Sequence, residues 1–305
     1  MTGTSAGSRN KGGSEMSVNF DYSQAFSRNI GWVTPEEQAQ LRRTRVAIGG
    51  LGGVGGSHLV TMARLGVGRF SISDLDDFDV PNFNRQHGAS LATVGQPKLA
   101  VMAQTIRDIN PEVDLRLFDT GISHDNVDAF LDDVDLYLDS LDIFALDIRR
   151  KVFQRCHERG IPAITAAPMG MGTAMLIFLP NKMSFEEYFR FDDVSEFEDK
   201  IIQFVIGVSP AMMQRSYLVA RSSVNFLHRK VPSTAMGIEL AAGVAGTHAL
   251  KVLLGRGPIP SAPWGLHFDA FRNRLIRTWR PWGNRNPLQR LMFHRVRSLL
   301  RGMGS

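Results

Sequence analysis

A glycine-rich turn between an apolar strand and an apolar helix most constrains what this chain can fold into. Residues 46–48 are apolar and precede a Gly-x-Gly-Gly-x-Gly turn that consists of Gly50, Gly52, Gly53 and Gly55. A helix from about 57 to 65 and a strand at 70–73, which ends at Asp74, are predicted next. The glycines let the backbone approach a phosphate, the helix N-terminus offers N–H groups, and the Asp can reach ribose hydroxyls. The sequence therefore predicts the first unit of a nucleotide-binding fold.

A polar segment follows closely after Asp74. The glycine turn alone fits an ordinary NAD(P)-binding domain, because such turns occur in every kind of Rossmann protein. A nicotinamide enzyme has no need of the polar side chains packed just past the ribose Asp, at Asn82, Asn84, Arg85 and Gln86. These residues favour a nucleotide site of another kind.

Strands and helices alternate along most of the chain. Strands are predicted at 115–118, 136–138, 163–165 and 174–179, and helices at 35–43, 123–131, 145–159 and 236–254. Two further strands, 266–270 and 274–279, are expected to form a final hairpin. The pattern predicts an α/β fold, with a Rossmann-like, mostly parallel sheet, helices on both faces and a C-terminal antiparallel strand extension.

Composition along the chain predicts one large domain with additions. Residues 1–19 are expected to be a disordered leader, because they lack the apolar core of a secretory signal, and Met16 is a second candidate start. Residues 20–280 are expected to form the domain, with an acidic, aromatic insertion at 181–235 on its substrate or dimer side. Residues 281–305 are expected to form a basic amphipathic tail.

The positive charge is concentrated near the C-terminus. Residues 272–305 contain nine arginines and no acid, so the rest of the chain has 26 basic residues (35 minus 9) against 30 acidic ones. The basic pI is therefore no argument for nucleic-acid binding by the body of the protein. A helix at 286–300 is expected to dock on its own or a partner protein, with attachment to acidic lipid as the alternative.

Cysteine usage and hydropathy bound the class of protein. The single cysteine, Cys156, excludes an internal disulfide framework and fits a reducing, cytoplasmic compartment. It lies inside the predicted helix at 145–159, where we expect a structural role and not an activated thiol. The apolar stretches 163–179 and 236–254 contain prolines, glycines or charges, so no transmembrane helix is expected.

Four other side chains carry a chemical signal of their own. Lys98 lies in the first turn of a helix predicted to end near 110, where the dipole disfavours a cation, so it either reaches solvent or faces an anion. Asp139 and Asp142 follow a predicted strand, at the sheet edge where ligands gather. They are candidates for metal binding or proton transfer, or are turn and cap residues. From its spacing alone, Arg28 is predicted to be a surface arginine.

Together these motifs resemble those of the MoeB/ThiF/HesA adenylyltransferases, the bacterial relatives of ubiquitin-activating enzymes. The resemblance covers roughly residues 22–255. Besides the glycine turn it rests on GVGRFSISDLD at 66–76, NFNRQ at 82–86, TVGQPK at 93–98, IRDINP at 106–111 and Asp-x-x-Asp at 139–142. In this family a substrate carboxylate attacks the α-phosphate of ATP and gives an acyl-adenylate and pyrophosphate. The resemblance thus implies ATP and Mg²⁺ as cofactors.

The resemblance also implies a role for each site residue. Asp74, with Asp76 beside it, would bind the ribose above the glycine turn. The phosphates would be held by Asn82, Arg85 and Lys98, with support from Gln86. Asp142 would hold Mg²⁺, and catalysis would depend on these charges. Arg28 resembles an arginine that reaches the γ-phosphate from the neighbouring subunit, which implies a homodimer.

The sequence departs from the family pattern in three places. Members that pass the acyl group to sulfur have a cysteine in the loop before the small-residue helix, and here that loop, 225–234, has none. Paired Cys-x-x-Cys motifs are also absent, so we expect neither a thioester or persulfide step nor a structural zinc. The asparagine that often follows the magnesium-binding aspartate is replaced by Ile143.

These features lead to three hypotheses for function. The first is an ATP-dependent adenylyltransferase that activates the carboxylate of a carrier protein, a peptide or a small acid, and passes it to a nucleophile other than cysteine. The second is an enzyme similar to the dehydratase that cyclises threonylcarbamoyladenosine in tRNA, whose RNA the arginine-rich tail would contact. The third is a nucleotide-binding interaction module without turnover.

Overall fold

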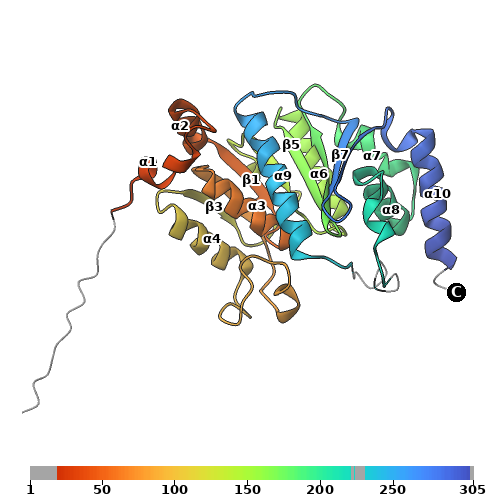
Figure 1. Cartoon of the computed structure of the whole chain (residues 1–305), viewed down its shortest axis with the longest axis horizontal. Coiled ribbons are helices and arrows are strands. Elements are labelled where there is room, and N and C mark those ends of the chain that lie inside the picture. The colour runs from red at the N-terminus through yellow and green to blue at the C-terminus, as the bar shows by residue number, and fades with distance from the viewer. Residues whose placement is uncertain (1–18, 221–222, 224–230, 303–305) are drawn as a thin grey trace, which may run out of the picture.

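The computed structural model describes residues 19–220, 223 and 231–302, and its organising element is an eight-stranded mixed sheet (Figure 1). Its strands are β1 (Arg45–Gly49), β2 (Arg69–Ser73), β3 (Asp114–Phe118), β4 (Leu136–Asp139), β5 (Ala163–Met169), β6 (Gly172–Phe178), β7 (Trp264–Asp269) and β8 (Arg274–Trp279). Their order is β3-β2-β1-β4-β5-β6-β7-β8. The pairs from β3 to β5 are parallel and those from β5 to β8 antiparallel. This confirms the predicted fold class.

Helices cover both faces of this sheet. They are α1 (Tyr22–Ala25), α2 (Pro35–Arg43), α3 (Gly53–Arg64), α4 (Lys98–Ile109), α5 (Val127–Phe130), α6 (Leu146–Glu158), α7 (Phe185–Phe189), α8 (Phe197–Val208), α9 (Ala235–Leu253) and α10 (Pro287–Gly302). Figure 1 shows α3 and α9 running across one face, and α10 at the end of the molecule farthest from α1. None of the helices in the described ranges is both long and apolar enough to cross a membrane.

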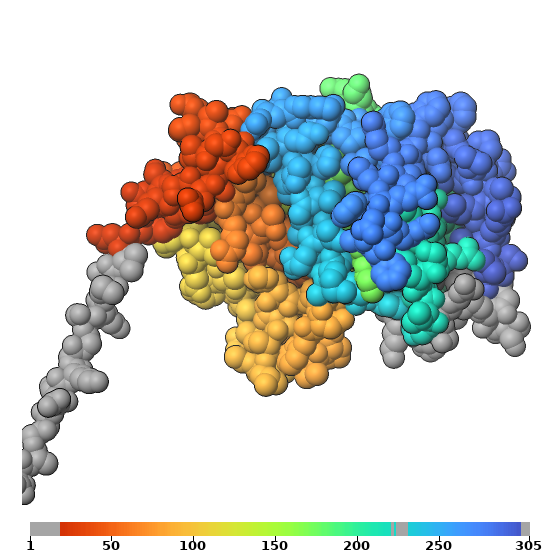
Figure 2. All heavy atoms as spheres, viewed as in Figure 1, coloured from red at the N-terminus to blue at the C-terminus, as the bar shows by residue number. Residues whose placement is uncertain are grey.

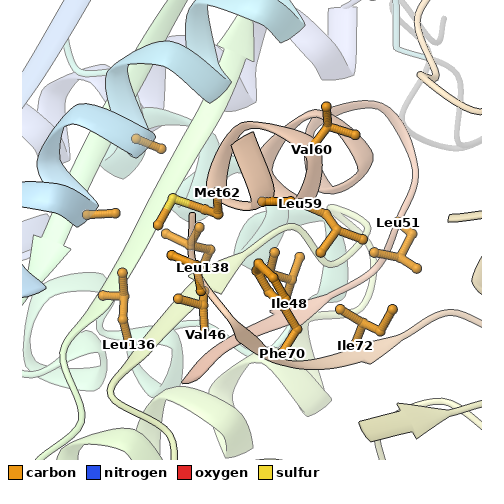
Figure 3. Packing of buried hydrophobic residues seen from close by; sticks show 14 of the residues in the cluster. Val46, Ile48, Leu51, Leu59, Val60, Met62, Phe70, Ile72, Leu136 and Leu138 are labelled. Atoms are coloured by element: carbon orange, nitrogen blue, oxygen red, sulfur yellow. The ribbon is translucent and has the colours of Figure 1, made fainter. Parts of the chain in front are cut away.

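The first hydrophobic core lies between the sheet and α3, α4 and α9. Successive side chains of a strand point to opposite faces, so Val46 and Ile48 of β1 point into this core while Ala47 points away. Figure 3 shows Val46 and Ile48 facing α3, from which Leu59 and Met62 point toward the sheet. Burial of these side chains fixes the first strand–turn–helix unit against the middle of the sheet.

The second core lies on the opposite face and is rich in aromatic rings. Phe153 of α6 stacks on Phe185 of α7, with ring centroids 4.1 Å apart, and Phe189 contacts Phe204 of α8 at 5.2 Å. The predicted insertion at 181–235 therefore shares a core with the sheet over its described part. Cys156 also belongs to this core and is 1% exposed.

Two predicted helix starts are wrong, and the strand predicted at 163–165 extends to Met169. The helix expected from about 57 begins at Gly53, because close contact with β1 favours glycines in a first turn that helix propensity would disfavour. The helix expected at 123–131 is shortened to Val127–Phe130, since Ser123 and Asn126 hydrogen-bond each other in a turn before it. The predicted leader and much of the 225–234 loop lie outside the described residues.

His58 of α3 should make stability depend on pH. The side chain is 1% exposed, and neither ring nitrogen has a hydrogen-bond partner among the described residues. Burial lowers the pKa of the imidazole to about 4. The unfolded chain takes up the proton near the ordinary value of 6.5, so stability falls as the pH drops from 6.5 toward 4. We expect His58→Leu to lose about 2 kcal/mol less free energy of unfolding than the wild type between about pH 7 and pH 5.

Urea unfolding at the two pH values measures this difference. The matched control is His87→Leu, because His87 is exposed and should leave the pH dependence unchanged. Equal losses in the wild type and in His58→Leu would contradict the assignment.

Candidate functional site

The glycine turn connects β1 to α3 at the carboxyl ends of the parallel strands. Gly50 has a left-handed φ of +86°, and its N–H donates to the carbonyl of Ser73 at 2.8 Å. A Cβ at Gly55 would lie 1.8 Å from the Gly50 carbonyl oxygen, so α3 is packed too closely on the strand end for any other residue. The Ser140 hydroxyl donates to the carbonyls of Gly49 and Gly50, at 2.8 Å each. The first N–H groups of α3 are thereby fixed at the sheet edge.

Asp74 connects the end of β2 to the same turn. Its carboxylate accepts hydrogen bonds from the Leu51 N–H at 2.6 Å and from the Asp76 N–H at 2.8 Å. Burial raises the pKa of Asp74, while the two backbone N–H groups and the nearby Lys98 charge oppose that rise. Asp74, which is predicted to bind the ribose, therefore lies beside the glycine turn and is held by two backbone N–H donors.

Lys98 is buried, with its ammonium next to a carboxylate. Its side chain is 7% exposed, its Nζ lies 3.0 Å from Asp76 Oδ2, and its backbone N–H donates to the Asp76 carbonyl at 2.9 Å. A buried ammonium needs such a partner, which explains a cation in the first turn of α4. Of the two alternatives that the sequence left open, the lysine faces an anion. Since the Asp76 side chain is 70% exposed, the ion pair borders solvent.

The polar segment after β2 packs against the glycine turn through Arg85 and Gln86. A Cβ at Gly53 would lie 3.6 Å from Arg85 Cγ, and one at Gly52 would lie 3.6 Å from Gln86 Nε2. Gln86 is 8% exposed, and its buried Oε1 accepts no hydrogen bond from the residues that the structure describes. The Asn82 side-chain oxygen accepts from the Asp79 N–H at 3.0 Å and so stabilises the turn that presents this segment.

The two carboxylates after β4 have different environments. Asp139 is 3% exposed and forms an ion pair with Arg149, at 3.0 Å from Nε, and it accepts a hydrogen bond from the Tyr137 hydroxyl at 3.2 Å. Asp142 is exposed, and one of its oxygens accepts from the Phe144 N–H at 2.8 Å. Asp139 is therefore neutralised by Arg149, whereas the Asp142 carboxylate faces solvent.

Arg149 holds the loop that presents Asp142, a role that the sequence analysis missed. Its guanidinium binds the Asp139 carboxylate and donates to the carbonyls of Leu141 and Asp142, the latter at 3.1 Å. It also lies 4.5 Å from the centre of the Phe204 ring of α8. The sequence could have indicated this role, because Arg149 lies on the otherwise apolar face of α6, where a charged residue needs a partner.

Arg28 lies away from the site within one chain. Its neighbour Asn29 donates from Nδ2 to the Leu65 carbonyl at 3.1 Å, which places this segment at the C-terminal end of α3. The glycine turn is at the other end of α3, and a helix of 12 residues is about 18 Å long. The exposed Arg28 side chain therefore belongs to a surface at the amino ends of the parallel strands.

The donor set fits a magnesium nucleotide. The turn leaves no space for a Cβ at Gly55 and presents backbone N–H groups, which suits a phosphate. Lys98 and Asp74 lie close to each other beside the turn, and the Arg85 guanidinium donates to the Pro81 carbonyl at 2.8 Å and to Asn84 Oδ1 at 2.9 Å. A single exposed carboxylate, Asp142, suits Mg²⁺, which is usually bound through one or two carboxylates together with substrate phosphates.

Comparison with known protein families identifies the family of this chain. The profile of the ThiF family matches residues 26–291. The chain belongs to the ThiF family. The sequence-based recognition of the family is thereby confirmed.

Two curated ThiF-like relatives share part of their sequence with this chain. The tRNA threonylcarbamoyladenosine dehydratase of Bacillus subtilis is 37% identical over 144 residues, which are 46% of this chain and 55% of the relative. The molybdopterin-synthase adenylyltransferase of Salmonella typhimurium is 30% identical over 143 residues, which are 47% of this chain and 57% of the relative. The matched segment thus spans little more than half of either relative.

A solved structure of the E. coli tRNA N6-threonylcarbamoyladenosine dehydratase in complex with AMP has the same fold. It aligns with a TM-score of 0.56 at 22% identity, and the alignment covers 76% of this chain and 95% of that one. At this level of identity the likeness supports the fold of this ThiF-family chain.

Substitution of Arg149 should loosen the Asp142 loop. Arg149→Lys keeps a positive charge beside Asp139, but one ammonium cannot hold both the carboxylate and two carbonyls. We expect the free energy of unfolding in urea to fall by about 1–3 kcal/mol. The neighbouring Arg150 pairs with Glu186 and Asp192 in a more exposed position, so Arg150→Lys should cost less than about 1 kcal/mol. Equal costs for the two variants would contradict the role of Arg149.

Proposed function

We propose that this protein uses ATP to adenylate a carboxylate and transfers the acyl group directly to a nitrogen or oxygen nucleophile. The buried ammonium of Lys98, held beside the glycine turn, carries this proposal. A buried cation at this position suits an attack on the α-phosphate, because negative charge has to be neutralised there. Two anions must meet in that attack, and fixed positive charges lower its barrier.

Each group has a place in the proposed reaction. The α3 N-terminus and the glycine turn cradle the phosphates, Asp74 and Asp76 lie at the ribose, and Asn82 and Gln86 support the phosphate side. Lys98 and Arg85 neutralise the charge that builds up on the phosphates as the substrate carboxylate approaches. Asp142 is the residue that would hold Mg²⁺, whose charge offsets that of the triphosphate. Hydrophobic Ile143 beside it leaves Asp142 as the sole carboxylate of this loop that is open to solvent.

Cys156 is unsuited to receive the acyl group. It is the one cysteine of the sequence, it is buried in α6, and burial raises the pKa of its thiol far above the ordinary value. A thiol in this state is inert as a nucleophile. The activated acyl group is therefore expected to react with an amine or a hydroxyl, which belongs either to a second molecule or to the substrate itself.

The favoured substrate is a carboxylate carried on tRNA. The 37%-identical relative is named a tRNA threonylcarbamoyladenosine dehydratase, and loss of water by internal attack on an acyl-adenylate needs no cysteine. The carboxylate of a carrier protein is the second candidate, supported by the 30%-identical molybdopterin-synthase adenylyltransferase. A nucleotide-binding module without turnover is the third hypothesis. The comparisons thus favour tRNA over the carrier protein or small acid that the motifs first suggested.

Pyrophosphate release tests the reaction. We expect ATP-dependent release with tRNA that bears threonylcarbamoyladenosine, and a loss of about 100-fold or more in Asp142→Ala, because the charge of the triphosphate is then unscreened. Mass analysis should find an adenylated intermediate or a product lighter by one water. Glu112→Ala is the control, since Glu112 forms a surface ion pair with Arg42. ATP binding without release for tRNA, carrier proteins or small acids would support the non-catalytic module.

Arg28 tests the predicted homodimer. If Arg28 completes the site of a second copy, Arg28→Ala and Lys98→Ala should each be inactive as separate proteins. After equal mixing and subunit exchange, half of the dimers combine the two variants and each has one intact site. Pyrophosphate release should then recover to about one quarter of the wild-type rate. An active Arg28→Ala protein, or no recovery on mixing, would rule out this role.

A further inference from the structure

An aromatic pair lies at the same sheet edge as the glycine turn. The end of β5 is at this edge because β5 runs parallel to β4 and β4 to β1. The β5–β6 turn therefore lies there, and so does the end of β7, because Gly172 is paired with Asp269. Tyr217 reaches this turn, and its ring lies 4.5 Å from that of Phe271, which follows β7, at an interplanar angle of 35°. Figure 2 shows the blue β7–β8 segment on the surface near the teal residues after α8.

Tyr217 is rigidly held while Phe271 faces solvent. The Tyr217 hydroxyl donates to Asp269 Oδ2 at 2.9 Å and accepts from the Met171 N–H at 3.0 Å. Asp269 is fully buried, and its other oxygen accepts from the Arg272 N–H at 3.0 Å. Phe271 is 58% exposed, although a large apolar ring gains by burial. The hydrogen-bonded ring of Tyr217 and the exposed ring of Phe271 together form a platform on which a flat ligand can stack.

An arginine lies close in sequence to each ring of this platform, because Arg215 precedes Tyr217 by two positions and Arg272 follows Phe271. Arg215 and Arg272 are exposed, and neither belongs to an ion pair in the part of the chain that the structure describes. Arg272 also lies close enough to Tyr217 to lower its pKa against the larger effect of burial. From residue 270 to the end of the sequence there is no acid. The surface is therefore complementary to an anion.

One helical turn connects the platform to the nucleotide site. The Thr234 hydroxyl, which caps α9, donates to the Gly170 carbonyl at 2.7 Å, and the Asn84 side chain donates to the Ser233 carbonyl at 3.1 Å. Ile238, one turn into α9, packs against Gly53, where a Cβ would lie 2.8 Å from its Cδ1. A molecule bound on Phe271 would thus have a carboxylate arm of moderate length within reach of the phosphates.

We propose that Phe271 and Tyr217, with Arg215 and Arg272, bind the unpaired nucleobase of the RNA that carries the carboxylate. This inference rests on the proposed adenylation of a carboxylate and names the class of molecule that bears it. Proteins bind single-stranded RNA by stacking bases on aromatic rings and by contacting phosphates with cations. A peptide would use the platform less well, because its side chains need pockets, whereas a base needs a flat exposed ring.

Direct binding of RNA tests this site without turnover. The probe is a fluorescent hairpin RNA with threonylcarbamoyladenosine in its loop, and its affinity for the full chain is measured by anisotropy in the absence of ATP. Phe271→Ala should weaken binding about 5- to 150-fold, and Phe271→Trp should restore it, because stacking on one aromatic ring is worth about 1–3 kcal/mol per base. Arg272→Ala should reduce the slope of log affinity against log salt by about 1. Trp32→Ala removes a ring near Arg28 that is more exposed than Phe271, and it should change neither the affinity nor its salt dependence.

The outcomes separate this site from the adenylation itself. Unchanged RNA affinity in Phe271→Ala would overturn the site, as would displacement of the RNA by an acidic peptide with higher affinity. Absence of pyrophosphate release with every acid, together with weaker RNA binding by Phe271→Ala, would refute adenylation and keep the RNA site. Turnover of tRNA with an unchanged KM in Phe271→Ala would keep adenylation and refute the RNA site.

Discussion

The close approach of α3 to the end of β1 is the constraint on which the site depends. Space is so limited that Gly55 cannot carry a Cβ, and Gly50 has to adopt a left-handed backbone. Because of this close approach, α3 begins directly at the carboxyl ends of the strands. Its first N–H groups therefore face the region where the loops after β2 and β4 begin. A longer or looser connection would leave these groups in solvent, away from Asp74 and Asp142.

The buried polar contacts around this turn make the site rigid before any ligand arrives. Asp74 is held by two backbone donors, Lys98 by Asp76, and the Asp142 loop by Arg149. A preorganised charge needs no rearrangement during the reaction, which is why such contacts favour catalysis more than they favour stability. Arg149 also contacts Phe204 of α8, so the segment expected to select the substrate lies against the loop expected to bind the metal.

Much of the central sheet was predictable, because its strands are continuous apolar runs that end in polar residues or glycine. The hydrophobic pattern located β1, β2 and β4, and the motifs located the residues that meet at the glycine turn. The start of α3 was not predictable from propensity, since the three glycines of its first turn disfavour a helix until tertiary contacts form it.

Long-range pairing limited the remaining predictions. Asp139 and Asp142 look alike in the sequence, and only the position of Arg149, one helix later, shows that one is neutralised and the other free for a cation. The Tyr217–Phe271 pair joins residues that are 54 positions apart, as their numbers show, and no local pattern connects them. Arg28 could be recognised by motif, but its place at the far end of α3 follows from hydrogen bonds of its neighbour Asn29.

The position of β8 at the end of the sheet has a consequence for solubility. An edge strand exposes unpaired N–H and C=O groups, which can recruit a strand of another molecule and start aggregation. Here Arg274 and Arg277 are exposed on that strand, and a second copy aligned with it would bring like charges together. The arginines of β8 thus protect the open side of the sheet against uncontrolled β-pairing, whatever else the basic C-terminal segment binds.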